Sequence, residues 1–159
     1  MAEEQEPLLN TDEGIEVLVV AVDASTEAAR VLATAARQAR AAPQATVHLI
    51  HVFRASRMDR ARAGAPLPPE DAVHDAKDHF ESQVRTLKRQ CRNSVVSHFV
   101  VGDPNAEIIK LAEESRADLL VIGTHDHTGL ERLLLGSIAE ALMRKAPCSV
   151  LVVRRPHRR

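Results

Sequence analysis

The segment from Asp118 to Val153, DLLVIGTHDHTGLERLLLGSIAEALMRKAPCSVLVV, contains the pattern that decides the fold. Leu119 to Ile122 is a short run of leucine and β-branched residues, and such a run predicts a buried strand. Gly123 ends this run, and apolar residues then recur at helical spacing from Leu130 to Leu142. Ser149 to Val153 is a second apolar run of strand length. The segment is therefore predicted to be a strand, a glycine-containing loop, a helix and a strand, which together form a βαβ unit.

Gly136 and Ser137 are the residues of this unit that best suit an anion. A parallel sheet places its ligands at the carboxyl ends of its strands, and backbone N–H groups beside a hydroxyl favour a negative charge there. Glycine inside a helix costs about 1 kcal/mol relative to alanine, so a purely structural role is less favourable. Two interpretations follow: the helix begins near Gly136 rather than at Leu130, or Gly136 permits a close contact.

The composition is that of one globular domain. The chain has 159 residues, of which 45% are apolar and 27% charged, and this length allows a sizeable core. Only 2% are aromatic, with no Trp and no Tyr, so the core must be built from Leu, Val, Ile and Ala. The chain has few of the stacking side chains that single-strand nucleic-acid binders use, and its formal net charge of −1 provides no basic excess for nucleic acid or an anionic membrane.

The two ends of the chain differ in charge. Residues 1–14 are acidic and polar, which predicts a flexible leader rather than a secretory signal, and residues 156–159 form a basic tail. Cys91 and Cys148 are too few for a disulfide framework or a metal site. No apolar run approaches the roughly 20 residues of a membrane span. The expected location is a reducing cytoplasm.

The rest of the chain repeats the alternation of strand and helix. The other expected strands are Ile15–Val22, Thr46–Phe53 and Val95–Val101. The first expected helix is capped by Asp23 or Ser25 and ends at about Arg40, and two further helices are expected at Glu70–Arg92 and Ala106–Ser115. The strands are nearly continuous in apolar residues, which is typical of burial on both faces of a parallel sheet. Each connection is long enough for a parallel crossover. The predicted class is therefore α/β, with one doubly wound sheet of five parallel strands and helices on both faces.

The loop and helix of the first unit carry a family motif. Gly123, Gly136 and Ser137 match three of the four fixed positions in the pattern G-x2-G-x9-G-[ST], and Asp126 occupies the position of the second glycine. The surrounding THDHTGLERLLLGS and APCSVLVVRR are also similar. On these residues the chain resembles the universal stress proteins, whose ATP-binding members have this pattern. The resemblance extends over residues 15–155.

The resemblance implies the order of the sheet and the place of a ligand. The strands would follow the Rossmann-like order 3-2-1-4-5, in which strands 1 and 4 are neighbours. An adenine nucleotide, ATP, would bind in the cleft at the carboxyl ends of these two strands. A homodimer would form through the last strand, Ser149 to Val153. The residues that the resemblance assigns to the cleft are Ala21, Val22, Asp23, Val52, Ile122, Gly123, Asp126, Gly136, Ser137 and Ile138.

Simpler roles compete with these assignments. Asp23 is also suited to capping the helix that follows it, and Val52 to an ordinary place in the core. Gly123 is also suited to ending a strand. The sequence does not separate these roles from contact with a nucleotide.

Asp126 is the one departure from the motif. Aspartate tolerates positive φ better than most residues, so the turn itself can survive the change. Its carboxylate would repel a phosphate by roughly 4 kcal/mol at about 4 Å and an effective dielectric near 20. A Mg2+ ion between carboxylate and phosphate would reverse that sign. Nucleotide binding is therefore expected to depend on Mg2+, or to be lost.

Two functions from different classes follow from these patterns. The first is a stress-response protein that binds an adenine nucleotide without turnover, and the alternative is an interaction protein, a dimer of the same fold with an empty or altered cleft. A slow ATPase is a third interpretation, but the sequence offers no clear general base for it beyond the candidates Asp126 and His125, and the chain has no P-loop or nucleophile elbow. His125, Asp126 and His127 are a poor metal site because adjacent side chains do not converge on one ion.

Overall fold

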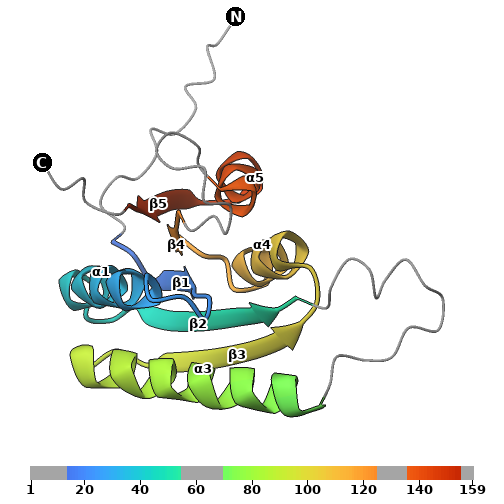
Figure 1. The fold of residues 1–159 in the computed structure, drawn as a ribbon. Helices are drawn as coiled ribbons and strands as arrows, with labels where there is room; N and C mark the ends of the chain where they lie inside the picture. The colour runs from blue at the N-terminus through green and yellow to red at the C-terminus, as the bar shows by residue number, and fades with distance from the viewer. Residues whose placement is uncertain (1–13, 55–69, 125–135, 155–159) are drawn as a thin grey trace, which may run out of the picture.

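Five parallel strands form one sheet with helices on both of its faces in the computed structural model, which describes residues 14–54, 70–124 and 136–154 (Figure 1). The strand order is β3-β2-β1-β4-β5, so the predicted class and order are both confirmed. The elements are β1 (Val17–Ala21), α1 (Ala28–Ala41), β2 (Thr46–Phe53), α3 (Glu70–Gln90), β3 (Val95–Val101), α4 (Pro104–Glu114), β4 (Leu119–Gly123), α5 (Ser137–Lys145) and β5 (Ser149–Val153).

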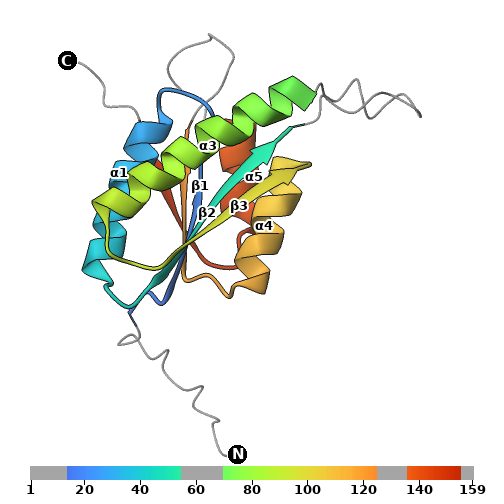
Figure 2. The ribbon, with the colours of Figure 1, turned by 90° about the horizontal axis from the view of Figure 1, so that it is seen from below.

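The helices divide into two pairs, one on each face of the sheet (Figure 2). Alternate strand residues point to opposite faces, so Leu18 and Val20 pack under α1 and α3 while Val19 packs under α4 and α5. The central strands β1 and β4 are buried on both sides, as their uninterrupted apolar runs predicted. Alanine lets α1 approach the sheet closely, through the buried residues Ala28, Ala35, Ala36 and Ala39.

Several boundaries differ from those expected. The strand predicted at Ile15–Val22 is shorter, although the N–H of Val22 still donates to the carbonyl of Ile50 at 3.0 Å. Helix α4 begins at Pro104 rather than Ala106 because the Asp103 carboxylate accepts a bond from the N–H of Ala106 at 3.1 Å. Proline fits this first helical position, where no donor is needed. The helix predicted at Glu70–Arg92 ends at Gln90.

The structure decides between the two interpretations of the α5 start and shows that the expected cap of α1 is wrong. Gly136 precedes α5 with an extended backbone, φ −55° and ψ 147°, so a helix continuous from Leu130 is excluded and the later start is confirmed. Neither Asp23 nor Ser25 caps α1, because Glu27 precedes that helix and makes no side-chain cap hydrogen bond. The Asp23 carboxylate instead accepts bonds from the N–H of Ser25 at 3.0 Å and from its hydroxyl at 2.5 Å.

Four segments lie outside the described residues: 1–13, 55–69, 125–135 and 155–159. They include most of the acidic leader, the basic tail and the loop that carries Asp126. Within the described ranges, no helix combines the length and apolar character needed to cross a membrane.

Candidate functional site: a cavity at the carboxyl ends of β1 and β4

A cavity of about 260 Å³ lies where the central strands β1 and β4 end. These two strands pair in parallel, and β1 pairs with β2 on its other side. The chain therefore leaves β1 and β4 in opposite directions across the sheet, which is the place where open α/β sheets bind ligands. The lining comprises Ala21, Val22, Asp23, Ser25, Glu27, Ala28, Val31, Val52, Arg54, Pro104, Ile108, Ile122, Gly123, Ile138, Ala139 and Leu142.

Seven of the ten residues assigned to the cleft from the sequence lie in this lining: Ala21, Val22, Asp23, Val52, Ile122, Gly123 and Ile138. Gly136 and Ser137 are not in the lining, but they immediately precede Ile138 at the start of α5. Asp126 lies outside the described residues. The structure thus brings together residues from β1, β2, β4 and α5 that are distant in the sequence.

The turn between β1 and α1 is held by hydrogen bonds at successive residues. Nδ1 of His51 lies 3.0 Å from the carbonyl oxygen of Val22 and donates to it. Nε2 of Gln83 donates to the carbonyl oxygen of Asp23 at 2.8 Å. The carboxylate of Asp23 then accepts the two bonds from Ser25 described above. Asp23 therefore shapes the turn that lines the cavity rather than capping α1.

The environment of His51 favours the uncharged form of its ring. Burial lowers the pKa of His51, and the nearby Asp23 carboxylate and the bond to Val22 oppose that shift only in part. The side chain is 7% exposed and its ring packs beside Phe80 and Phe99. The bond to Val22 gives this buried histidine a hydrogen-bond partner within the chain.

Gly123 ends β4 at a point of close packing. An added Cβ atom would lie 3.2 Å from Cγ2 of Val31 on α1, which is tighter than an ordinary contact. The glycine therefore has a structural role, because it lets α1 lie against the end of β4 beside the cavity. This contact is compatible with close approach of a ligand to the same backbone.

Helix α5 begins beside the cavity without a side-chain cap. Gly136 is buried and its carbonyl accepts the first helical bond, from the N–H of Glu140 at 2.9 Å. The N–H groups of Ser137, Ile138 and Ala139 precede that bond, and helix starts of this kind favour an anion. Helix α4 differs, because Asp103 satisfies its first turn.

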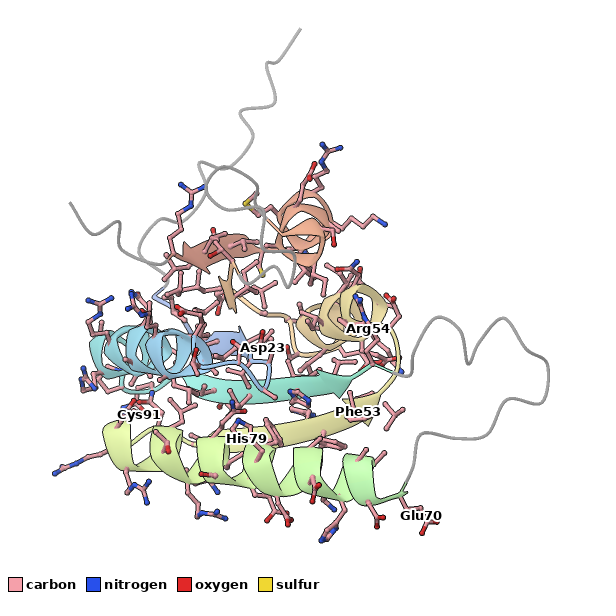
Figure 3. The ribbon with its side chains drawn as sticks, in the orientation of Figure 1. Asp23, Phe53, Arg54, Glu70, His79 and Cys91 are labelled. Atoms are coloured by element: carbon pink, nitrogen blue, oxygen red, sulfur yellow. The ribbon has the colours of Figure 1, made fainter. Side chains whose placement is uncertain are left out.

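Three charged side chains also line the cavity: Asp23, Glu27 and Arg54. Oε2 of Glu27 lies 3.5 Å from Nε of Arg30. Arg54 is exposed and directly follows β2, and Figure 3 shows it near α4. Arg54 was not among the residues assigned to the cleft from the sequence. Its position after a central strand was the available signal, since parallel strands bring their carboxyl ends to one edge.

Other lining residues were missed because they belong to helices on the second face. Pro104 and Ile108 come from α4 and Leu142 from α5. Their sequence pattern indicated only an apolar helix face. Which part of that face borders a cavity depends on how α4 and α5 pack together.

Metal-binding side chains do not gather in the described parts of the chain, where no group of three or more His, Cys, Asp or Glu is placed to hold an ion. The candidate cluster His125, Asp126 and His127 lies outside those parts. Cys91 is buried and Cys148 is half-buried, and both are free thiols.

Comparison with known proteins agrees with this architecture. A model of the universal stress protein family matches residues 14–154. The chain belongs to the universal stress protein family. The match includes every strand and helix described above.

Two relatives illustrate the range of similarity within the universal stress proteins. Universal stress protein A homolog 1 of Coxiella burnetii is 34% identical over 141 residues, which cover 86% of this chain and 94% of the relative. Universal stress protein MJ0531 of Methanocaldococcus jannaschii is 41% identical over 83 residues. That alignment covers 50% of this chain and 49% of the relative, so the chain spans about half the length of this relative.

Solved structures of the family share the fold. Hypothetical protein MJ0577 is similar with a TM-score of 0.78 and 26% identity, over 92% of this chain and 100% of that chain. A universal stress protein from Archaeoglobus fulgidus, solved in complex with dAMP, has a TM-score of 0.66 and 25% identity, over 88% of this chain and 98% of that chain.

Proposed function

We propose that the chain binds an adenine nucleotide in the cavity at the carboxyl ends of β1 and β4, as a stress-response protein of the cytoplasm without turnover of its own. The observation that carries the proposal is the cavity itself, which joins an apolar wall to an uncapped helix start at the switch point of the sheet. The related Archaeoglobus fulgidus protein in complex with dAMP supports the same class of ligand.

The residues of the cavity fit the two ends of such a ligand. Val52, Ile108 and Ile122 provide apolar surface for a base. The N–H groups at the start of α5 and the hydroxyl of the exposed Ser137 provide donors for a phosphate. We therefore place the base beside β2 and α4, and the phosphates beside α5.

Asp23 and Glu27 line the cavity together with Arg54, so the charged residues of the lining carry a formal charge of −1 and do not neutralise a polyphosphate. Asp126 adds a third carboxylate if its loop follows the family motif. A Mg2+ ion held between a phosphate and one of these carboxylates offsets the repulsion. We therefore propose Mg2+ as the companion of ATP.

We also propose that the folded unit, residues 15–155, is a homodimer through β5. Strand β5 is at one edge of the sheet and contains only Ser149 and four apolar residues. An apolar edge strand favours pairing with another chain. The alternative function, a dimeric interaction protein with an empty cleft, shares this assembly and differs only in the ligand.

Calorimetric titration with ATP tests the nucleotide and the role of Asp126 together. Wild type should bind weakly without Mg2+ and more strongly with it. Asp126→Gly should bind more tightly than wild type without Mg2+, by at most roughly 4 kcal/mol and less with screening, because a repulsive charge is removed.

Two further variants separate charge from shape in this titration. Asp126→Asn removes the charge but keeps the size of the side chain, so it should reproduce most of the gain. Asp75→Asn removes a charge from the exposed side of α3 and should change nothing. Equal affinity of wild type and Asp126→Gly with and without Mg2+ would show that Asp126 points away from the phosphates. No binding to any variant would favour the interaction protein.

A further inference from the structure

The side chain of Gln83 makes a hydrogen bond to the backbone of the turn between β1 and α1, which lines the cavity. It belongs to the middle of α3, is only 6% exposed, and is not part of the cavity lining. Its Nε2 donates to the carbonyl oxygen of Asp23 at 2.8 Å, across 60 positions of sequence. Asp23 and His79, the two residues that Nε2 of Gln83 contacts, are labelled in Figure 3. Helix α3 is therefore tied directly to the turn between β1 and α1.

The orientation of the Gln83 amide is fixed by its two acceptors. One hydrogen goes to Asp23, and Nε2 of His79 lies 3.3 Å away as the acceptor for the other. Oε1 is buried and has no hydrogen-bond partner among the described residues. Exchange of the amide atoms would bring Oε1 against the carbonyl oxygen of Asp23, two acceptors in contact. The side chain thus keeps its bond to Asp23 although its own oxygen is left unpaired, and such exceptions call for an explanation.

The ties to Val22 and Asp23 determine where the next N–H groups point. In a planar trans peptide the N–H is directed opposite to the carbonyl of the preceding residue. His51 and Gln83 hold the carbonyls of Val22 and Asp23 from residues outside the cavity lining. The N–H groups of Asp23 and Ala24 therefore point to the opposite side of the turn. In the described structure these two N–H groups make no hydrogen bond within the chain.

We propose that Gln83 is a positioning residue for the ligand of this cavity, because its bond to the Asp23 carbonyl aims the Ala24 N–H at that ligand. The inference rests on the proposed function, since it assumes a nucleotide in the cavity. Gln83 does not touch the ligand. It acts through the backbone of the turn. Asp23 and Ser25, the two neighbours of Ala24 in that turn, line the cavity.

The variant Gln83→Glu makes this bond depend on pH. A protonated carboxyl group can donate to the Asp23 carbonyl as the amide does, whereas an ionised one cannot donate and repels the oxygen. The titratable groups around this contact are Asp23 on the turn, His51 on β2 and His79 on α3. All three are present in wild type as well, so the ratio of variant to wild-type affinity isolates the introduced carboxyl.

Adenosine is the probe, because it carries no charge between pH 5 and pH 8. Gln83→Glu should bind adenosine with nearly wild-type affinity at pH 5 and about tenfold more weakly than wild type at pH 8. Gln83→Leu should bind weakly at both pH values because it never donates. The matched control is Val84→Ala, the next residue of α3, which loses core packing but has an apolar side chain that makes no hydrogen bond to the turn. It should bind as wild type does at both pH values.

Amide hydrogen exchange in the ligand-free protein gives a second readout. In Gln83→Glu, exchange at Ser25, whose N–H donates to the Asp23 carboxylate, should rise relative to wild type from pH 5 to pH 8, and in Val84→Ala it should not. A ratio of affinities that is flat with pH, or an equal loss in Val84→Ala, would overturn the role of Gln83 while leaving nucleotide binding intact. Failure of wild type to bind adenosine and AMP at either pH would overturn the proposed function, and the role of Gln83 with it.

Discussion

Gly123 illustrates how one residue serves packing and a candidate site together. An added Cβ atom would lie only 3.2 Å from Cγ2 of Val31, and this distance explains why the strand ends in glycine even without a ligand. The same absence of a side chain leaves the backbone of β4 open to the cavity. The motif position is therefore not by itself proof of nucleotide binding.

Substitution of Gly123 by alanine should destabilise the protein by about 1 kcal/mol, because the added methyl group crowds Val31. In a Val31→Ala background the crowding is relieved, so the same substitution should be neutral or stabilising. Urea unfolding of the four proteins in this double-mutant cycle measures the coupling. Gly14→Ala is the control, since no atom lies within 4 Å of its added Cβ. An equal cost in both backgrounds would show that the contact with Val31 is not the cause.

At the scale of elements, strands β2 and β3 are joined by a pair of histidines on the α4 side of the sheet. Nδ1 of His48 lies 2.9 Å from Nε2 of His98, so at least one of these nitrogens must be unprotonated. Burial lowers the pKa of both His48 and His98, and each ring is half-buried. The more deeply buried His51 on β2 also has a lowered pKa.

The lowered pKa values predict that the free energy of unfolding falls in acid. Below pH 6.5 the unfolded chain binds protons at these histidines more readily than the folded protein does, so stability is complete above pH 6.5 and declines as pH falls toward the folded pKa values. His98→Gln removes one titrating partner and should reduce this slope. The exposed His74→Gln on α3 should keep it. Urea unfolding between pH 5 and pH 7.5 checks this, and identical slopes for wild type and His98→Gln would refute it.

Strand β5 is the element that we expect to assemble the molecule. Val150 and Val152 are half-buried at one edge of the sheet. Val152→Lys should therefore convert the proposed dimer into a monomer, because it introduces a charge at the contact. Val96→Lys is the matched control on the opposite edge strand, β3, where the side chain is 39% exposed. Light scattering at tens of micromolar protein measures the molar mass of each protein, and a monomeric wild type would contradict the prediction.

At the scale of the whole molecule, the fold was largely predictable because its determinants are local. The apolar runs Thr46–Phe53, Val95–Val101 and Ser149–Val153 became strands with those bounds. The position of Gly136 also indicated the true start of α5 as one of two alternatives. The strand order came from the family resemblance, because periodicity alone determines only the class.

The candidate site was predictable only in part, because much of it depends on contacts between distant residues. The tie from Gln83 to Asp23 spans 60 positions and that from His51 to Val22 spans 29. No local pattern distinguishes Gln83 from the other polar residues of α3. Asp23 was expected to cap a helix, and its carboxylate instead closes on Ser25 two residues later.

The central claim is that the cavity beside β1 and β4 binds an adenine nucleotide, and amide NMR mapping tests it most directly. Addition of AMP or Mg2+–ATP to isotope-labelled protein should shift the amide signals of Val22 to Ser25, Val52, Gly123 and Ser137 to Ala139. A second cavity, of about 380 Å³ between α3 and β3 near Phe80 and Phe99, provides an internal comparison. Shifts confined to the first set would support the claim. No shifts at millimolar nucleotide, or shifts only around Phe80 and Phe99, would contradict it.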